Sequence, residues 1–369
     1  MPNHPTGVVH PEYRRRWRVV EQSDGYRVVR TWLYATPNEG FVKKTLGHLS
    51  FMVTSVLFGF RKAGRADVVV VSSPTFFSIF SAMLIAKLRR APLVVEVRDL
   101  WPGIFVELGV LTNRRLIWLL ERLELFAYRV ASHVVVVTDG FRADLVARGV
   151  PAAKVTTITN GVDLQRFQPK AGRPDDRAWL GAGPDDLLVL YIGAHGVSHA
   201  LSSVVRTADL VRDTPIHFAF VGEGADKANV MRAAEELGVS NVTFRDGVPR
   251  DRVSDLVAAA DVCLVPLRDI PLFSTFIPSK MFEFMAAGRP IVGSVRGEPA
   301  EILKAAGSVV VAPEQSEALA GSLMGLVANR SQLLEIARRQ RDHVAGHYDR
   351  QALATHYRAI GPAAIVAAL

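Results

Sequence analysis

Cysteine is almost absent from this chain of 369 residues, which contains one, Cys263. A single cysteine cannot form an internal disulfide, so a disulfide-stapled extracellular domain is excluded and a reducing cytoplasm is expected. Cys263 lies in the apolar run 261–266 (DVCLVP), which predicts a buried strand. Core packing is therefore its expected role, with a reactive thiol as the alternative.

Long apolar runs are lacking as well. The run 46–60 (LGHLSFMVTSVLFGF) is shorter than the roughly 20 residues that span a bilayer, and His48 with several hydroxyl residues interrupts it. Basic pairs flank it at 43–44 and 61–62. Two interpretations stay open, a helix buried in the protein and an interfacial helix on a membrane. The first ten residues are polar and proline-rich, so they do not resemble a secretion signal.

Acidic residues are too few in the first half of the chain to balance its basic residues. Residues 1–165 hold 22 Lys and Arg against 13 Asp and Glu, a net charge of +9, whereas 166–369 hold 22 against 23, a net charge of −1. A basic face suits an anionic membrane or nucleic acid. Outside the first half, interleaved basic and aromatic residues are not evident, so we expect the membrane and no nucleic acid.

Six apolar runs alternate with helix-like segments along the chain. Continuous apolar strands separated by helices predict parallel sheets covered on both faces, hence an α/β fold. The periodicity lapses at 170–174 and resumes at Leu187, which predicts two Rossmann-like domains. We assign 1–168 to the first domain, 169–345 to the second, and 346–369 to a helix that packs back on the first. The six runs are 67–71, 93–97, 133–137, 187–191, 216–221 and 262–265.

The segment 277–290 (IPSKMFEFMAAGRP) combines a cation and a carboxylate at the predicted start of a helix. Ser279 is placed to cap that helix, the free amides of its first turn can receive a phosphate, and Lys280 and Glu283 share one face. Lys280 and the amides would hold a diphosphate, while Glu283 would accept hydrogen bonds from ribose hydroxyls. From this segment alone, an ordinary capped surface helix is the alternative.

Short motifs follow the predicted strands in a fixed order: 158–163 (ITNGVD) with Phe167, 191–196 (YIGAHG), 221–224 (VGEG), 242–249 (VTFRDGVP), 260–266 (ADVCLVP) and 277–290. Together they resemble the retaining family 4 glycosyltransferases, which have the GT-B fold of two facing Rossmann-like domains. The similarity covers nearly the whole chain. Residues 98–102 (RDLWP) and 2–7 (PNHPTG) are further similar to the branch that builds bacterial surface polysaccharides, often from aminosugar donors on polyprenyl-linked acceptors.

The resemblance implies a donor site in the second domain. Gly193 and Gly196 would let the backbone approach the diphosphate, and Glu223 with Gly247 would line the nucleotide base. The motif Asp-x-Asp does not occur in the chain, so the metal-dependent alternative fold is not indicated and we expect neither a metal nor another cofactor. The implied donor-binding residues are Gly193, His195, Gly196, Glu223, Gly247, Thr275, Ile277, Pro278, Ser279, Lys280 and Glu283.

Three positions depart from the family pattern. Thr275 stands where the first carboxylate of the Glu-x7-Glu motif would precede Glu283, so contacts to the donor sugar would differ. His195 lies where many members carry a basic pair, and it is either a replacement phosphate ligand or a structural histidine. Arg98-Asp99 replaces His-Asp in the first domain. Asp99 is the candidate for contacting or deprotonating the acceptor and Arg98 for an anion or sugar contact, with an Arg98–Asp99 ion pair as the alternative.

The beginning of the chain departs most from the family. A relative would carry a further strand, a glycine-rich loop and a helix before 2–7, so the first domain is expected to lack its first βα unit. Either Met1 is an internal start within a longer gene, which we favour, or this is a shortened form whose activity is in question. The loss of a central strand would leave the first domain less stable than the second.

The resulting hypothesis is a cytoplasmic glycosyltransferase on the inner face of the cell membrane. It would move a sugar from a nucleotide diphosphate donor, UDP-linked, to a membrane- or polyprenyl-linked saccharide acceptor with retention. Such a transfer needs no enzyme nucleophile, because the diphosphate can leave and the acceptor hydroxyl attack on the same face of the sugar. The alternatives are a GT-B-type sugar-nucleotide epimerase and a truncated, inactive or basic binding protein.

Overall fold

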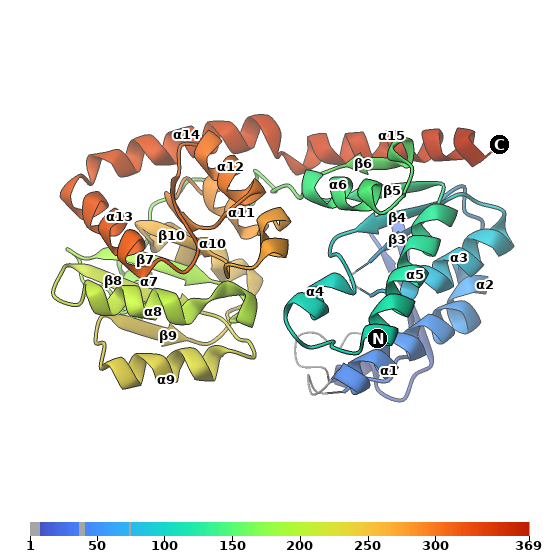
Figure 1. Cartoon of the computed structure of the whole chain (residues 1–369), viewed down its shortest axis with the longest axis horizontal. Helices are drawn as coiled ribbons and strands as arrows, with labels where there is room; N and C mark the ends of the chain where they lie inside the picture. The colour runs from blue at the N-terminus through green and yellow to red at the C-terminus, as the bar shows by residue number, and fades with distance from the viewer. Residues whose placement is uncertain (1–7, 37–40, 74, 369) are drawn as a thin grey trace. The chain divides into compact units, whose positions relative to one another are not determined.

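The chain divides into two compact units in the computed structural model, which describes residues 8–36, 41–73 and 75–368. Unit 1 comprises Met1–Ile158 and Thr355–Leu369, and unit 2 comprises Thr159–Ala354 (Figure 1). The first division thus falls ahead of the predicted boundary after residue 168, and the C-terminal segment joins unit 1 from Thr355 rather than from 346. The motif at 2–7 lies outside the described residues.

Unit 1 is built on a parallel sheet with the strand order β3-β4-β5-β6 in the described residues. Its strands are rich in valine, whose branched side chain suits a pleated, covered surface. On one face Val94 and Val135 pack against Ile360 of α15. The strands are β3 (Val69–Ser72), β4 (Leu93–Val97), β5 (His133–Val136) and β6 (Val155–Thr157), and the helices after them are α3 (Ser78–Arg89), α4 (Gly103–Glu107), α5 (Arg114–Val130), α6 (Asp139–Ala147) and α15 (Arg350–Ala368).

An antiparallel hairpin forms a separate sheet in unit 1. Strands β1 (Arg18–Ser23) and β2 (Tyr26–Thr31) pair around Gly25, whose φ of 81° is the left-handed conformation that a tight hairpin turn requires. Within the described residues the hairpin does not pair with β3, which is therefore an edge strand. Val70 in β3 is 53 % exposed, so one face of this edge strand is open to solvent.

The basic and apolar segment 41–65 forms α1 (Phe41–Thr54), a π-helical turn η2 (Ser55–Gly59) and α2 (Phe60–Ala63). One side packs on the unit, where buried Thr54 hydrogen-bonds to the Trp32 carbonyl. Arg89 of α3 lies over the Phe60 ring at 4.1 Å and donates to the Phe60 carbonyl at 2.6 Å. The other side exposes apolar residues such as Leu57. In the described part of the chain, no helix is long and apolar enough to cross a membrane.

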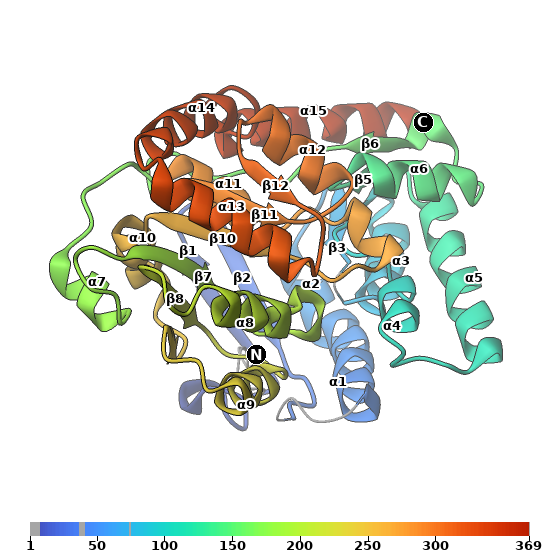
Figure 2. The same ribbon diagram turned by 60° about the vertical axis from the view of Figure 1, so that its left-hand side comes forward.

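Unit 2 is built on a parallel sheet with the strand order β12-β11-β10-β7-β8-β9. Every residue of the central strand β7 (Leu187–Ile192) is buried. Helices α8 (Leu201–Leu210) and α13 (Ser316–Ala328) lie side by side over one face, where their leucines and valines meet Phe218 and Phe220 (Figure 2). The other strands are β8 (Ile216–Val221), β9 (Val242–Arg245), β10 (Val262–Pro266), β11 (Ile291–Ser294) and β12 (Val309–Val311).

The remaining elements of unit 2 connect these strands or cover the sheet. The helices are α7 (Pro174–Trp179), α9 (Lys227–Leu237), α10 (Arg250–Ala259), α11 (Lys280–Ala286), α12 (Glu298–Ala305) and α14 (Ser331–His347), with 3-10 turns η4 (Val197–His199) and η5 (Pro271–Thr275). The α/β prediction of two parallel-sheet units is confirmed, and the six predicted runs are β3, β4, β5, β7, β8 and β10.

Candidate functional site

Two glycine loops meet at the carboxyl end of β7 and β8. The Gly193 amide donates to the Val221 carbonyl, and the His195 amide donates to the Glu223 carbonyl, both at 2.9 Å. A Cβ built on Gly222 would lie 1.9 Å from the Gly193 carbonyl oxygen, so no larger residue fits there. The two loops are therefore held backbone to backbone, and they form one rigid edge of the site.

Lys280 begins α11 and points at this edge. Its Nζ is buried, has no hydrogen-bond partner among the described residues, and lies 4.0 Å from the centroid of the Tyr191 ring. A Cβ built on Gly193 would lie 2.8 Å from that Nζ, so the glycine makes room for the lysine. Burial lowers the pKa of Lys280 to about 7, opposed by the Glu283 charge. A buried, unpaired ammonium is unfavourable unless an anion meets it, so Lys280 is suited to an anionic ligand.

Two histidines flank Tyr191. His195 is fully buried and neither ring nitrogen has a hydrogen-bond partner in the described residues. Burial lowers the pKa of His195 to about 4, assisted by the charges of Lys227 and Lys280. Burial also lowers the pKa of His199 to about 3. Both rings are thus neutral near pH 7, and His195 adds no positive charge beside Lys280.

The start of α11 differs from the prediction in its cap. Ser279 has helical dihedral angles, φ −58° and ψ −25°, and makes no side-chain cap hydrogen bond, so the predicted N-cap is wrong. A capping residue needs an extended backbone that aims its oxygen at the following amides. Thr275 Oγ1 donates to the Leu272 carbonyl at 2.8 Å, within its own turn. Ile277 is buried at 9 % exposure, and the Pro278 carbonyl accepts the Met281 amide at 3.0 Å.

Glu283 lies one turn after Lys280, and no ion pair joins the two side chains. It is half-buried, and burial raises its pKa. The positive charges of Arg250, Arg350 and Arg166 oppose that rise, in decreasing order, and Lys280 adds less. The arginines come from the start of α10, the start of α15 and the segment before α7. Glu283 is therefore a carboxylate in a basic environment, available as a hydrogen-bond acceptor.

The predicted base-site residues are joined by a small polar network. Glu223 Oε1 accepts hydrogen bonds from the Gly247 amide at 3.2 Å and from Lys227 Nζ at 3.0 Å. Lys227 Nζ also donates to Asp246 at 2.6 Å. These contacts tie the loop after β8 to the loop after β9, so Glu223 and Gly247 lie together as expected. Gly196 lies at the other end of the first glycine loop, directly before η4.

The predicted catalytic pair lies in unit 1, in the loop after β4. Arg98 is exposed, Asp99 is half-buried, and no ion pair joins them, which removes the structural alternative of a mutual salt bridge. Burial raises the pKa of Asp99, and the Arg98 charge opposes the rise. Two residues on, the buried Trp101 stacks on Phe76 with ring centroids 4.3 Å apart. This stack anchors the loop that carries Asp99.

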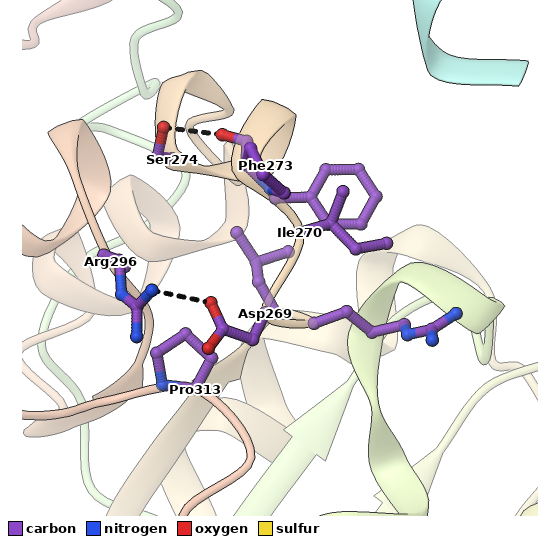
Figure 3. Close-up of a pocket in the computed structure, with 9 residues that line it drawn as sticks. Asp269, Ile270, Phe273, Ser274, Arg296 and Pro313 are labelled. Carbon is purple, nitrogen blue, oxygen red and sulfur yellow. Dashed lines mark hydrogen bonds and ion pairs between the residues drawn. The ribbon is translucent and has the colours of Figure 1, made fainter. Parts of the chain in front are cut away.

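A cavity of about 410 Å³ opens beside η5 in unit 2. Its wall comes from the loops that follow β10, β11 and β12, the edge at which ligands bind in such sheets. Arg296 pairs with Asp269 at 3.0 Å, and Ser274 Oγ donates to the Pro271 carbonyl at 2.7 Å (Figure 3). The cavity is lined by Leu267, Arg268, Asp269, Ile270, Pro271, Phe273, Ser274, Arg296 and Pro313.

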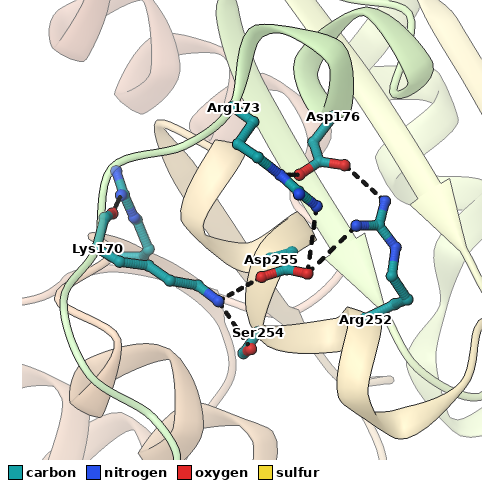
Figure 4. A network of polar contacts seen from close by, with 7 residues as sticks. Lys170, Arg173, Asp176, Arg252, Ser254 and Asp255 are labelled. Carbon is teal, nitrogen blue, oxygen red and sulfur yellow. Dashed lines mark hydrogen bonds and ion pairs between the residues drawn. The ribbon is translucent and has the colours of Figure 1, made fainter.

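A second polar cluster in unit 2 is saturated by its own ion pairs (Figure 4). Asp255 accepts from Lys170, from Arg252 at 3.2 Å and from Arg173 at 3.4 Å, and Arg252 also donates to Asp176 at 2.6 Å. The cluster fastens the segment before α7 to α10. Its charges are satisfied internally, so we assign it a structural role.

The sequence did not single out Tyr191 or His199, although the His-x3-His spacing of 195 and 199 was a signal. Among the residues that the structure describes, no group of three or more His, Cys, Asp or Glu side chains is placed to hold a metal. The site as built consists of two glycine loops, a buried lysine and a carboxylate one helical turn further on.

Known proteins resemble the chain over most of its length. A Glycosyl transferase 4-like domain matches residues 4–161, and a Glycosyl transferases group 1 domain matches 186–329. The colanic acid biosynthesis glycosyl transferase WcaI of Escherichia coli is 25 % identical over 336 residues, 86 % of this chain and 82 % of that protein. Sucrose-phosphate synthase of Thermosynechococcus elongatus has a TM-score of 0.75 at 20 % identity, covering 95 % and 87 % of the two chains. Anabaena HepE, solved with UDP and glucose, has a TM-score of 0.68 at 18 % identity, covering 85 % and 82 %.

Proposed function

Because the chain belongs to the family 4 glycosyltransferases of the GT-B fold, we propose that it transfers a sugar from a UDP-linked donor to a lipid-linked saccharide during polysaccharide synthesis. The relative WcaI is named for colanic acid biosynthesis, and the neighbour HepE was solved with UDP and glucose. The name of WcaI supports the proposed class of pathway, and the ligands of HepE support the proposed UDP-linked donor. In the branch that the sequence resembles, the donor sugar is often an aminosugar.

The observation that carries the proposal is the buried ammonium of Lys280 between Tyr191 and Gly193, for which the described part of the chain offers no hydrogen-bond partner. A diphosphate would supply an anion to this group. Glu283, one turn further on, would accept hydrogen bonds from the ribose hydroxyls. Glu223 and Gly247, already joined to each other, would form the wall against which the base lies.

The proposed reaction requires that the negative charge on the departing diphosphate be stabilised. As that bond breaks, negative charge grows on the diphosphate, and a fixed ammonium near it lowers the barrier. The acceptor hydroxyl then attacks from the side that the diphosphate leaves, so configuration is retained without an enzyme nucleophile. Asp99 would take the hydroxyl proton, a role that its raised pKa suits, and exposed Arg98 would contact an anion or a sugar.

For the lipid-linked acceptor, we propose that unit 1 binds to the surface of an anionic membrane. The segment 41–65 contains five exposed basic residues and no acidic residue, and Arg14, Arg15 and Arg16 are also exposed. Charges of this kind attract anionic headgroups over about 10 Å at 0.1 M salt. A lipid-linked acceptor would then reach the enzyme from the bilayer surface.

Calorimetry with UDP tests the donor site. Lys280→Met should weaken UDP binding by about 10- to 100-fold, because a hydrogen bond to a charged group contributes ~1.5–3 kcal/mol. Lys304→Met, which removes an exposed lysine of α12, is the matched control and should bind as the parent does. Equal affinity in a folded Lys280→Met variant would remove the lysine from the donor site.

Mass spectrometry of products tests the reaction class. The parent protein with UDP-sugars and a polyprenyl-linked saccharide should yield an acceptor heavier by one sugar, with the anomeric configuration of the donor. A donor epimerised in the absence of acceptor would instead identify a sugar-nucleotide epimerase. If neither product forms and the protein has no affinity for UDP, the proposal is refuted and a binding protein without this activity is the alternative.

A further inference from the structure

Helix α5 exposes an apolar row that no described residue of unit 1 covers. Leu116, Leu119, Phe126 and Val130 are 38 %, 47 %, 54 % and 52 % exposed. Their spacings of three, seven and four residues bring them onto one side of a helix with 3.6 residues per turn. Half-buried Leu123 lies midway along the same line. The row runs along almost the whole length of α5 (Arg114–Val130).

A row of arginines runs beside it. Arg115, Arg122 and Arg129 are all exposed and recur every seven residues, so they form a second line parallel to the apolar one. The Arg122 guanidinium lies 4.9 Å from the centroid of the Trp118 ring, which is itself 57 % exposed. Of the acidic residues on α5, Glu124 is fully buried and Glu121 is exposed. The exposed surface of α5 is therefore apolar and strongly basic.

Neighbouring helices continue this surface. Helix α3 packs against both α1 and α5 (Figure 1). Arg89 of α3 is tied to Phe60, so the segment that follows α1 is held against α3. Neither α1 nor α3 contains an acidic residue. The exposed apolar residues on these two helices and the intervening turn are Val42, Leu46, Val53, Leu57, Leu84 and Leu88, and the exposed basic residues are Lys43, Lys44 and Lys87.

We propose that the outer faces of α1, α3 and α5 form one docking surface for an anionic lipid bilayer. Leu119, Phe126 and Trp118 would enter the interface between headgroups and acyl chains, and the arginine row would lie on the lipid phosphates. The inference deepens the proposed function, since it names the surface that presents the enzyme to a lipid-linked acceptor. It extends the predicted membrane contact from 41–65 to α5, which begins only at Arg114.

Charge and apolarity together select a bilayer over other partners. A nucleic acid would use the arginines but would leave the apolar row in water. A second copy of this chain would cover the apolar row but would bring two arginine rows against each other, which is unfavourable. An anionic bilayer matches both rows at once, because it offers phosphates above an apolar interior.

Vesicle co-sedimentation tests the proposal with the full chain. Vesicles of phosphatidylcholine alone are compared with vesicles of equal parts phosphatidylcholine and phosphatidylglycerol. The parent should bind the anionic vesicles much more strongly. Leu119→Ser with Phe126→Ser should reduce that binding by roughly tenfold or more, since burial of each apolar side chain is lost. Arg115→Gln with Arg122→Gln should reduce it by about tenfold and flatten its salt dependence.

Matched variants in unit 2 control for nonspecific effects. Met324→Ser with Leu334→Ser, and Arg232→Gln with Arg338→Gln, change exposed residues of the same kinds and should bind vesicles as the parent does. Parent-like UDP affinity in every variant would verify the donor site of unit 2 independently, and a parent-like circular dichroism spectrum and unfolding curve would verify that unit 1 is folded. Unchanged vesicle binding by the Leu119/Phe126 variant, equal binding to both lipid mixtures, or a dimer dissolved by that variant without vesicle binding would each overturn the docking surface. If the parent protein does not bind UDP, the proposed function is refuted instead.

Discussion

The two units share a design, a parallel sheet with helices packed on it, but they differ in how completely the sheet is enclosed. In unit 2 the central strand β7 is buried at all of its residues, and helices α8 and α13 cover one face. In unit 1 the sheet ends at β3, whose Val70 is exposed to solvent. Among the described residues, 18 large apolar side chains are exposed in unit 1 and six in unit 2.

We infer from this difference that unit 2 binds a small ligand, whereas unit 1 has exposed surface that can contact a much larger partner. Unit 2 brings Lys280 to the glycine loops at the carboxyl ends of β7 and β8, and Glu283 lies one helical turn after Lys280. Unit 1 carries the positive charge of the chain together with its exposed apolar rows. A closed core favours a rigid binding site, whereas exposed apolar surface marks a contact with another phase or molecule.

The largest expected effect is on catalysis, which should depend on Asp99 in unit 1, whereas donor binding should depend on unit 2. Asp99→Asn should lower the turnover number by about 10²–10⁴-fold, the usual contribution of a general base, and leave the affinity for UDP unchanged. Steady-state kinetics and calorimetry measure the two quantities separately. Asp67→Asn, an exposed change in the same unit, is the control. Full activity in the Asp99 variant would remove it from the reaction.

The stability of the two units should also differ. Because unit 1 has an uncovered sheet edge and more exposed apolar surface, it should open first. Amides of β4 and β5 should then exchange at least about 100-fold faster than those of β7 and β8, an opening free energy lower by ~2.7 kcal/mol. Hydrogen exchange resolved by residue measures this. Equal protection of the two sheets would show that the open edge costs unit 1 nothing.

A smaller effect is expected from the carboxylate of unit 2. Glu283→Ala should raise the dissociation constant of UDP by about tenfold, through loss of a charge-assisted hydrogen bond worth ~1.5–3 kcal/mol. Glu301→Ala on the exposed side of α12 should bind as the parent does. Calorimetry with both UDP and GDP would detect the change, and parent-like affinity for both would exclude Glu283 from the ribose site.

The pH dependence of donor binding should be the smallest effect. Since burial lowers the pKa of Lys280 to about 7, the lysine is charged below that pH and loses its charge above it. UDP affinity should therefore fall by about fivefold between pH 7 and 8. The ligand-free protein should instead gain stability as the pH rises from about 7, because the unfolded lysine keeps its proton longer. Lys280→Met should lose both trends, and a parent with pH-independent affinity would contradict the assignment.

Much of the fold could be predicted from the sequence because the apolar runs are long and the valine-rich strands are buried on both faces. The runs at 93–97 and 187–191 became central strands, and the family resemblance was confirmed. The hairpin β1–β2 was not predicted, since each strand has only one pair of valines between charged and polar residues and so shows neither a continuous apolar run nor a regular alternation. Ser279 was mistaken for a cap because residue type suggests a cap, whereas backbone dihedral angles decide it.

Some features of the candidate site follow from the local sequence, and others follow only from the tertiary structure. Sequence alone determined the α/β class, the family and the placement of Lys280 and Glu283 one turn apart on one helix, because these depend on local spacing. Tertiary structure decided that Lys280 is buried over Tyr191, that His195 is enclosed and neutral, and that α5 adds an apolar and basic row to the face of α1. Burial and charge environment arise from segments far apart in the chain, so the order of the residues does not reveal them.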